Sequence, residues 1–273
     1  MGKFKSTTGK EFEGEFVNGN LTKGKITYAN RNSYVGELSN WKMHGKGILA
    51  VFQGSTYDAE FRDDALNGRG KFKSASGDEF EGEFLNGNQA KGKITYTNRD
   101  RYDGEVLNGK PQGKGEYKYA NNDKYVGEFL NGKKHGKGIL TRANGDMYEG
   151  EFRDDALNGI GKFKSASGEK YNGEFLNGKI HGDGILSFPN GNIYIAKFRD
   201  DCANGRGKAY FAKKVYRGGR DVEMYENFDG EFLNANIHKG TYISVDGDEY
   251  NGEFLHGKKH GKGELKYANY DRY

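Results

Sequence analysis

Four histidines occupy one repeated position in the chain, immediately before a glycine, and could in principle bind a metal. In a sheet of hairpins, one histidine per hairpin would lie about 9–10 Å from the next, because neighbouring strands are about 4.8 Å apart. Zinc holds its ligands at about 2.1 Å, so this spacing excludes a shared ion and favours hydrogen bonding in turns. The four residues are His44, His135, His181 and His260.

Glutamates recur in the same way, one per repeat, as at Glu128, Glu151 and Glu174. Paired acid and base catalysis needs a pocket, and the regular pattern instead indicates a ladder with lysines on a solvent-facing surface. The sequence Asp246-Gly247-Asp248-Glu249 resembles a calcium loop but lacks the twelve-residue ligand pattern. The repeated Gly-x-Gly steps lack the strand-to-helix context of a phosphate-binding loop. We therefore expect no enzyme activity, no metal and no cofactor.

A five-residue pattern, aromatic-x-[Gly/Ala]-[Glu/Lys]-[aromatic/aliphatic], recurs along the chain and must position these side chains. Successive copies begin 22 or 23 residues apart, with one interval of 34. A period of this length is typical of a stacked repeat architecture, and such arrays usually present a binding surface rather than a catalytic centre. The copies begin at Phe12, Tyr34, Tyr57, Phe80, Tyr102, Tyr125, Tyr148, Tyr171, Tyr194, Phe228 and Tyr250.

One repeat, YVGEFLNGKKHGKGILTRANGDM, reads as a β-hairpin. Tyr125, Gly127 and Phe129 alternate and therefore share one face of a strand. Asn131-Gly132 follows, which is the strongest short hairpin signal, and Asn144-Gly145 provides the turn into the next repeat. Glycine between two aromatics leaves space for a ring to lie over bare backbone, a device that holds sheets together. The sequence predicts an all-β fold, a single-layer, elongated antiparallel sheet of stacked β-hairpins.

The composition agrees with one continuous array. Only 34% of the residues are hydrophobic and the mean hydropathy is -0.97, whereas glycine occurs 44 times. The 43 basic and 39 acidic residues are intermixed, unlike the clustered basic residues of a nucleic-acid-binding surface. Cys202 is the only cysteine, and neither an apolar N-terminal run nor a membrane-spanning stretch is evident. We expect a cytoplasmic protein, with association with membranes or the cytoskeleton as alternatives.

The repeat resembles the MORN repeat, whose pattern is roughly Tyr-x-Gly-x-[Trp/Phe]-x-x-Gly-x-x-x-Gly-x-Gly. Close matches are YVGEFLNGKKHGKG at 125–138, YNGEFLNGKIHGDG at 171–184 and YNGEFLHGKKHGKG at 250–263. The resemblance implies stacked hairpins and roles in scaffolding, cytoskeletal or membrane-contact assemblies, protein docking and binding of acidic phospholipids. Some members place the array beside a lipid kinase or SET methyltransferase domain. This chain departs from the pattern where Ala59 and Ala196 replace glycine.

The array is predicted to run through residues 1–273 as one domain, cut mid-repeat at both ends. Gly2–Ser6 repeats as residues 70–74 and 161–165, and Tyr273 is the first residue of another five-residue pattern. Unpaired sheet edges favour pairing with another chain, so a homodimer through the array ends is one expected assembly.

The residues 206–227 form an irregular insertion in the array, where basic and aromatic residues are interleaved. Loops that interrupt a repeat often bind partners, although a longer hairpin is also tolerated at little thermodynamic cost. The candidate phospholipid-binding residues of this segment are Lys213, Lys214, Arg217 and Arg220.

These observations predict a non-catalytic scaffold that binds a protein partner, a helix or an extended segment, in an aromatic groove. One alternative is a peripheral membrane adaptor that binds acidic phospholipid headgroups, and another is a regulatory repeat segment of a larger enzyme. Binding of nucleic acid is not expected. The candidate partner-binding aromatic face consists of Tyr34, Tyr102, Tyr125, Phe129, Tyr148, Phe152, Tyr171 and Phe175.

Overall fold

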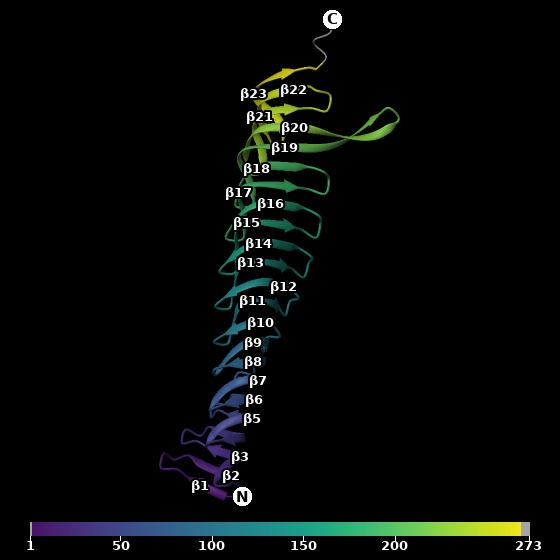
Figure 1. Ribbon diagram of the computed structural model, residues 1–273. Coiled ribbons are helices and arrows are strands. Elements are labelled where there is room, and N and C mark those ends of the chain that lie inside the picture. The colour runs from purple at the N-terminus through teal and green to yellow at the C-terminus, as the bar shows by residue number, and fades with distance from the viewer. Residues whose placement is uncertain (1, 269–273) are drawn as a thin grey trace. The chain divides into compact units, whose positions relative to one another are not determined.

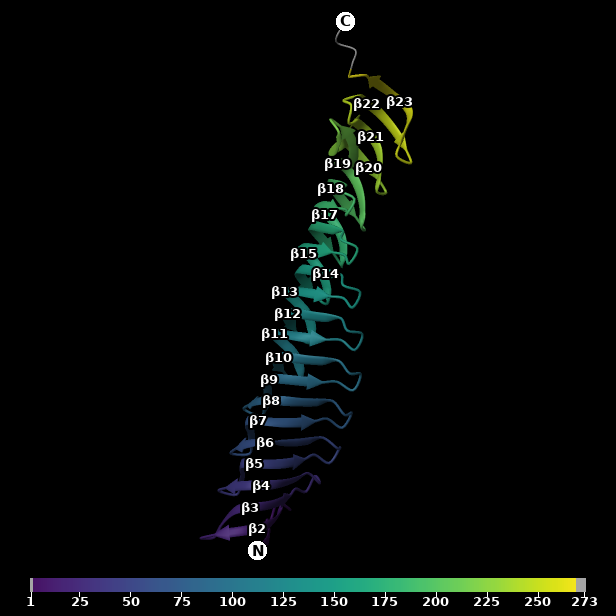
Figure 2. The same ribbon diagram turned by 90° about the vertical axis from the view of Figure 1, so that its right-hand side faces the viewer.

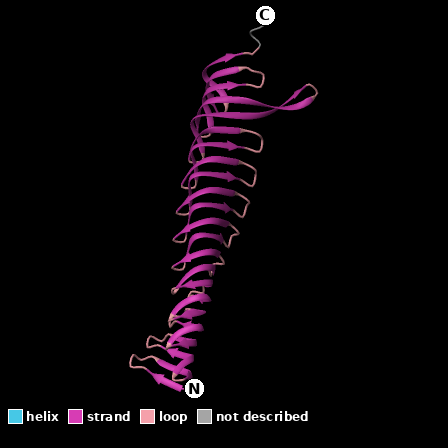
Figure 3. Cartoon of the chain, in the orientation of Figure 1, coloured by secondary structure: helices cyan, strands magenta, loops and turns pink. Residues whose placement is uncertain are grey.

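The computed structural model describes residues 2–268, and within them it contains strands, turns and loops but no helix (Figure 3). The chain forms two compact units that divide between Lys134 and His135. Within each unit, every strand pairs antiparallel with its neighbours in sequence, so each unit is an open meander of hairpins (Figures 1 and 2). The predicted fold class, an all-β antiparallel sheet of stacked hairpins, is confirmed.

The strands follow one another at the spacing that the repeat predicts. Unit 1 contains β1 (Gly2–Lys5), β2 (Glu11–Val17), β3 (Asn20–Thr27), β4 (Ser33–Ser39), β5 (Lys42–Ala50), β6 (Thr56–Arg62), β7 (Ala65–Lys73), β8 (Glu79–Leu85), β9 (Asn88–Thr95), β10 (Arg101–Leu107), β11 (Lys110–Lys118) and β12 (Lys124–Leu130). The next strand, β13 (Lys133–Thr141), begins in unit 1 and continues into unit 2. Unit 2 also contains β14 (Met147–Arg153), β15 (Ala156–Lys164), β16 (Lys170–Leu176), β17 (Lys179–Ser187), β18 (Ile193–Arg199), β19 (Cys202–Arg217), β20 (Arg220–Leu233), β21 (Asn236–Ile243), β22 (Glu249–Leu255) and β23 (Lys258–Lys266).

Tight turns close the hairpins, and in each of them both central residues have a positive φ. Asn131 and Gly132 have φ angles of 52° and 85°. This is the type I′ geometry, whose twist matches that of the flanking strands, so the predicted hairpin signal is confirmed. Trp41 occupies the second position of such a turn with φ 65°, a conformation that is strained for a bulky side chain.

The loops that join one hairpin to the next are held together by side-chain hydrogen bonds. Asp100 Oδ1 accepts a bond of 2.8 Å from the main-chain N–H of Ala120 in the following loop. Asp146 makes the equivalent bond of 2.9 Å to the N–H of Ala166. Because each loop satisfies a donor of the next, consecutive hairpins are kept in a constant register.

The core of each unit lies on one side of the sheet, here called the core face, where the aromatic rings pack edge to face. The centroid of the Tyr171 ring lies 5.2 Å from that of Phe175 on its own strand and 5.3 Å from that of Phe198 on the next hairpin, with interplanar angles of 88° and 82°. The Tyr171 hydroxyl donates to the main-chain carbonyls of Glu174 and His181, at 3.0 and 3.2 Å. Burial, reinforced by the Glu174 carboxylate, raises the pKa of Tyr171 to about 12.

Glycine provides the space for this ring. Gly173 and Gly184 lie opposite each other on β16 and β17. A Cβ atom on Gly173 would lie 2.5 Å from the Tyr171 hydroxyl, and a Cβ on Gly184 would overlap the same ring. The ring therefore rests on bare backbone, which confirms the predicted role of glycine in the repeat.

Candidate partner-binding surfaces

The aromatic residues predicted to form a partner-binding face lie in the core, and that prediction is corrected. Their rings pack against one another and over glycine, so the sheet itself buries them and leaves little surface for a partner. Tyr148 is half-buried. The other seven side chains have exposures of 4% or less: Tyr34, Tyr102, Tyr125, Phe129, Phe152, Tyr171 and Phe175.

The accessible surface of each sheet is its opposite side, the outer face. Successive side chains of a strand point to opposite faces, so residues that flank a core glycine point outward. In β10, Tyr102 and Val106 are buried whereas Asp103 and Glu105 are exposed. The second and fourth residues of the repeated pattern therefore lie on the outer face of each unit.

The outer face of unit 1 carries charges that alternate from strand to strand. Along one row, Asp58 pairs in register with Lys71, Lys71 with Glu81, Glu81 with Lys93, and Lys93 with Asp103. A neighbouring row runs Arg69, Glu83, Lys91 and Glu105.

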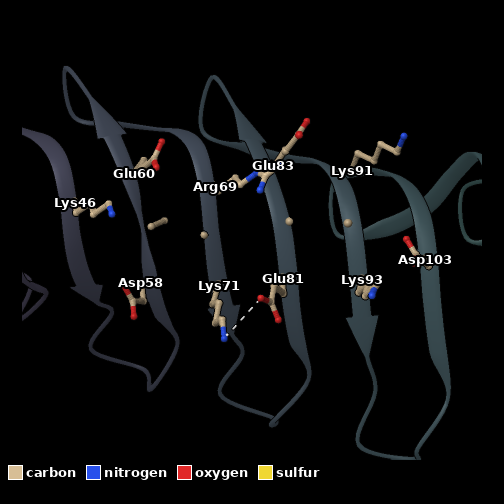
Figure 4. A pocket seen from close by; sticks show the side chains of 14 residues that line it. Lys46, Asp58, Glu60, Arg69, Lys71, Glu81, Glu83, Lys91, Lys93 and Asp103 are labelled. Carbon is tan, nitrogen blue, oxygen red and sulfur yellow. Dashed lines mark ion pairs between the residues drawn. The ribbon is translucent and has the colours of Figure 1, made fainter.

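All residues of these two rows except Glu105 line a shallow groove over β5–β10, and Lys46 and Glu60 line it as well (Figure 4). Five basic and five acidic side chains line it, and Lys71 Nζ lies 3.7 Å from Glu81 Oε1. Because opposite charges lie on neighbouring strands, they neutralise one another, and the groove has no strong electrostatic potential that would attract a simple ion.

Several outward positions of unit 2 are apolar where the charged rows of unit 1 carry charge, although unit 1 also exposes Val35, Ile48 and Val126. The exposed isoleucines of unit 2 are Ile139 at 40%, Ile160 at 62%, Ile185 at 45%, Ile195 at 42% and Ile243 at 37%. Scattered exposed apolar residues are normal on a protein surface. Here they are repeated on one face of a sheet, which gives that face contact area for a partner.

The insertion at 206–227 belongs to one long hairpin, made by β19 and β20 around the turn Gly218-Gly219. The neighbouring strands β18 and β21 pair with this hairpin only as far as Tyr210 and Asn227. The part beyond these residues therefore pairs only with itself and projects from the sheet (Figure 1).

Acidic side chains accompany the basic residues of this hairpin. Lys213 Nζ lies 3.3 Å from Glu226 Oε2, whose side chain is only 17% exposed. Arg217 makes an ion pair of 3.3 Å with Asp246 in the loop after β21. Lys214 lies opposite Glu223, and Arg220 lies opposite Arg217. Two of the four candidate phospholipid-binding residues are thus held in ion pairs within the protein.

The repeated histidines act through their main chain. The carbonyl oxygens of His44, His181 and His260 each accept a hydrogen bond of 3.2 Å from the tyrosine hydroxyl that begins the same repeat. The carbonyl of Gln112 accepts the same bond from Tyr102, and His44 Nδ1 is buried without a hydrogen-bond partner in the described part of the chain. These bonds therefore do not involve the imidazoles, and the predicted hydrogen bonding of the histidines in turns stays a prediction. Among residues 2–268, no group of three or more histidine, cysteine, aspartate or glutamate side chains is placed to hold a metal. The same residues include no helix with the length and apolar character needed to cross a membrane.

No curated protein matches this chain. The TCP domain of Drosophila melanogaster SAS-4 (dCPAP), in complex with a proline-rich motif of Ana2 (dSTIL), is 13% identical, with a TM-score of 0.34 over 57% of this chain and 83% of that one. A streptogramin B lyase is 14% identical, with a TM-score of 0.16 over 97% of this chain and 93% of that one. These scores are too low to support a functional argument.

The model of the MORN repeat matches eight segments that together span more than half of the sequence. The matched residues are 34–50, 57–79, 80–101, 102–124, 125–147, 148–170, 171–193 and 250–272. The family is generally non-catalytic, and a repeat-type scaffold or binding module is consistent with it. The chain belongs to the MORN-repeat family.

Proposed function

We propose that this chain is a non-catalytic scaffold for protein-protein interaction that binds its partners through the outer faces of its sheets. The observation that carries the proposal is that one face of the sheet is buried and the other is exposed. The aromatic side chains bury one another on the core face. The outer face carries regular rows of exposed charged side chains in unit 1 and exposed isoleucines in unit 2.

The balance of charge on these surfaces favours a protein partner over a membrane. A basic residue near an anionic bilayer contributes about 1 kcal/mol, but an adjacent acidic residue offsets that attraction. In unit 1 each outward lysine of the charged rows has a glutamate or aspartate as a cross-strand neighbour. A protein surface with its own mixed charges can match such a pattern, and charge complementarity of this kind gives specificity.

Two alternatives remain. A peripheral membrane adaptor would use the long hairpin, where Lys214 and Arg220 lie near the tip and Tyr216 is 73% exposed. A regulatory segment of a larger enzyme would use the same surfaces to bind a neighbouring domain. A cytoplasmic location belongs to the main proposal, and a homodimer through the array ends is compatible with it.

Photo-cross-linking tests the proposal. A photoreactive amino acid is placed at outward positions Glu81 and Asn172, and at the loop residue Ser76 as a control. We expect specific protein adducts from the outward positions in cells, and we expect the identified proteins to bind the purified chain. The purified chain should not sediment with phosphatidylserine vesicles. Strong, salt-sensitive sedimentation that is lost when Lys213, Lys214, Arg217 and Arg220 become serine would establish the membrane alternative instead.

A further inference from the structure

Two segments of the chain are near-copies of each other and lie in different units. Residues 57–84 and 148–175 differ at only seven of 28 positions. Both fold as three consecutive strands, β6–β8 in unit 1 and β14–β16 in unit 2, with the same pattern of pairing. Differences on their outer faces therefore alter the surface on an otherwise constant framework.

In the first copy, glutamates neutralise the outward lysines. Lys73 Nζ lies 3.0 Å from Glu79 Oε1, and Lys71 Nζ lies 3.7 Å from Glu81 Oε1. All four side chains are well exposed, so each pair contributes little to stability by itself. They nevertheless leave this part of unit 1 without excess charge.

In the second copy both glutamates are replaced. Lys170 stands where Glu79 stands in the first copy, and Asn172 stands in place of Glu81. Register then sets Lys164 directly opposite Lys170, and Lys162 opposite Asn172. Like charges directly opposite on a sheet are destabilising. The second copy therefore gives up two favourable pairs and gains a repulsive one.

These lysines surround a groove over β14–β17, which we call the lysine groove. Its outward apolar side chains are Met147 on β14 and Ile185 on β17, which are 39% and 45% exposed. The corresponding positions on β6 and β9 are Thr56 and Lys93. Phe163 and Tyr171, whose rings lie on the core face, border the groove from between the outward residues of β15 and β16. The groove combines an apolar surface with unneutralised positive charge.

The charge of the lysine groove is not compensated by its other lining residues. Lys162, Lys164 and Lys170 face one acidic side chain, Glu149, which lies opposite Lys162 on β14. None of the three lysines forms an ion pair within the described residues 2–268. A ligand that brings carboxylates would replace the pairs that the first copy makes internally and would relieve the repulsion between Lys164 and Lys170.

We propose that the lysine groove binds an acidic segment of a protein partner. An apolar side chain of that segment packs between Met147 and Ile185, and flanking aspartates or glutamates pair with Lys162, Lys164 and Lys170. The proposal rests on the proposed scaffold function and names the chemistry of one of its partners. A peptide fits this site better than a bilayer, because the positive charge is confined to one groove that also contains Glu149 and apolar side chains.

A random-peptide phage library, panned on the full chain, tests the inference. We expect the selected peptides to contain Asp or Glu on either side of a large apolar residue, and to bind more weakly as salt is added. Lys170→Glu restores the arrangement of the first copy and should lower the affinity of the selected peptides roughly tenfold, as expected for reversing one charge beside an anionic ligand. Glu79→Lys in unit 1 is the matched control and should leave that affinity unchanged.

The outcomes separate the two proposals. Selected peptides without acidic residues, or acidic peptides that bind the Lys170→Glu variant as tightly as the parent chain, would overturn the inference. Lys170-dependent binding to phosphatidylserine vesicles in place of peptides would assign the groove to lipid and overturn it as well. If the peptides fail while cross-linking still identifies protein partners at Glu81, the scaffold function stands and only the lysine groove is misassigned.

Discussion

The segments β6–β8 and β14–β16 have nearly the same core but different outer faces. In both, the first tyrosine packs at a tilt against a phenylalanine of the next strand, with ring centroids 4.7 Å apart: Tyr57 against Phe72, with an interplanar angle of 37°, and Tyr148 against Phe163, at 35°. On the outer face, ion pairs in one copy become a like-charge pair in the other. A repeat whose buried contacts lie on one face can therefore carry different charged side chains on the other face without losing the fold.

The largest expected effect tests whether the two cores are equivalent. Gly82→Val and Gly173→Val should each destabilise the protein by about 1–3 kcal/mol, the usual cost of overpacking. An added Cβ would lie 2.7 Å from the Phe80 ring in the first case and 2.5 Å from the Tyr171 hydroxyl in the second. Urea unfolding followed by circular dichroism measures both. A variant as stable as the parent would disprove the packing of rings on glycine.

Alkaline pH should distinguish the copies, because Phe80 of the first corresponds to Tyr171 of the second. Burial raises the pKa of Tyr171 to about 12, whereas an unfolded tyrosine titrates near 10. The unfolded state therefore loses its proton first, and this stabilising contribution is complete below about pH 10 and lost as the pH rises toward 12.

The free energy of unfolding should accordingly fall over that range, and Tyr171→Phe should reduce the fall. Denaturant titrations at about pH 8 and about pH 11 test this. Tyr171→Phe also removes two hydrogen bonds, so its stability at the lower pH supplies the baseline. An unchanged pH dependence in the variant would show that Tyr171 does not contribute.

Exchanging charges between the copies should have a smaller effect. Lys170→Glu replaces a like-charge pair with an ion pair and should stabilise the protein by roughly 0.2–1 kcal/mol, while Glu79→Lys should destabilise it by a similar amount. Thermal unfolding at low and high salt measures the difference, which should shrink as salt screens the charges. The two variants must change the stability in opposite directions, and a change in the same direction would contradict the comparison of the two copies.

The smallest effect on stability is expected at the position where the first copy carries Arg69 and the second carries Ile160. Both side chains point outward, opposite Glu83 and Glu174 respectively, and Ile160 is 62% exposed. Arg69→Ile and Ile160→Arg should each change stability by no more than about 0.5 kcal/mol, as is usual for surface positions. A larger loss for Ile160→Arg would mean that Ile160 packs against part of the chain.

The sequence alone determined the repeat, the hairpins and the role of glycine. Asn131-Gly132 specifies a turn because few residues other than glycine and asparagine adopt positive φ at low cost. The alternation of Tyr125, Gly127 and Phe129 specifies one face of a strand. Both signals depend on residues adjacent in the chain, so no knowledge of distant contacts was required.

Only the tertiary structure decided which face of the sheet is available to a partner. An aromatic row such as Tyr171 and Phe175 satisfies the pattern of a groove as well as that of a core, and burial depends on the next hairpin, which supplies Phe198. The lysine groove likewise exists because strand register places Lys164 opposite Lys170. These residues belong to different strands, so their interaction is set by the pairing of the strands and not by the local sequence.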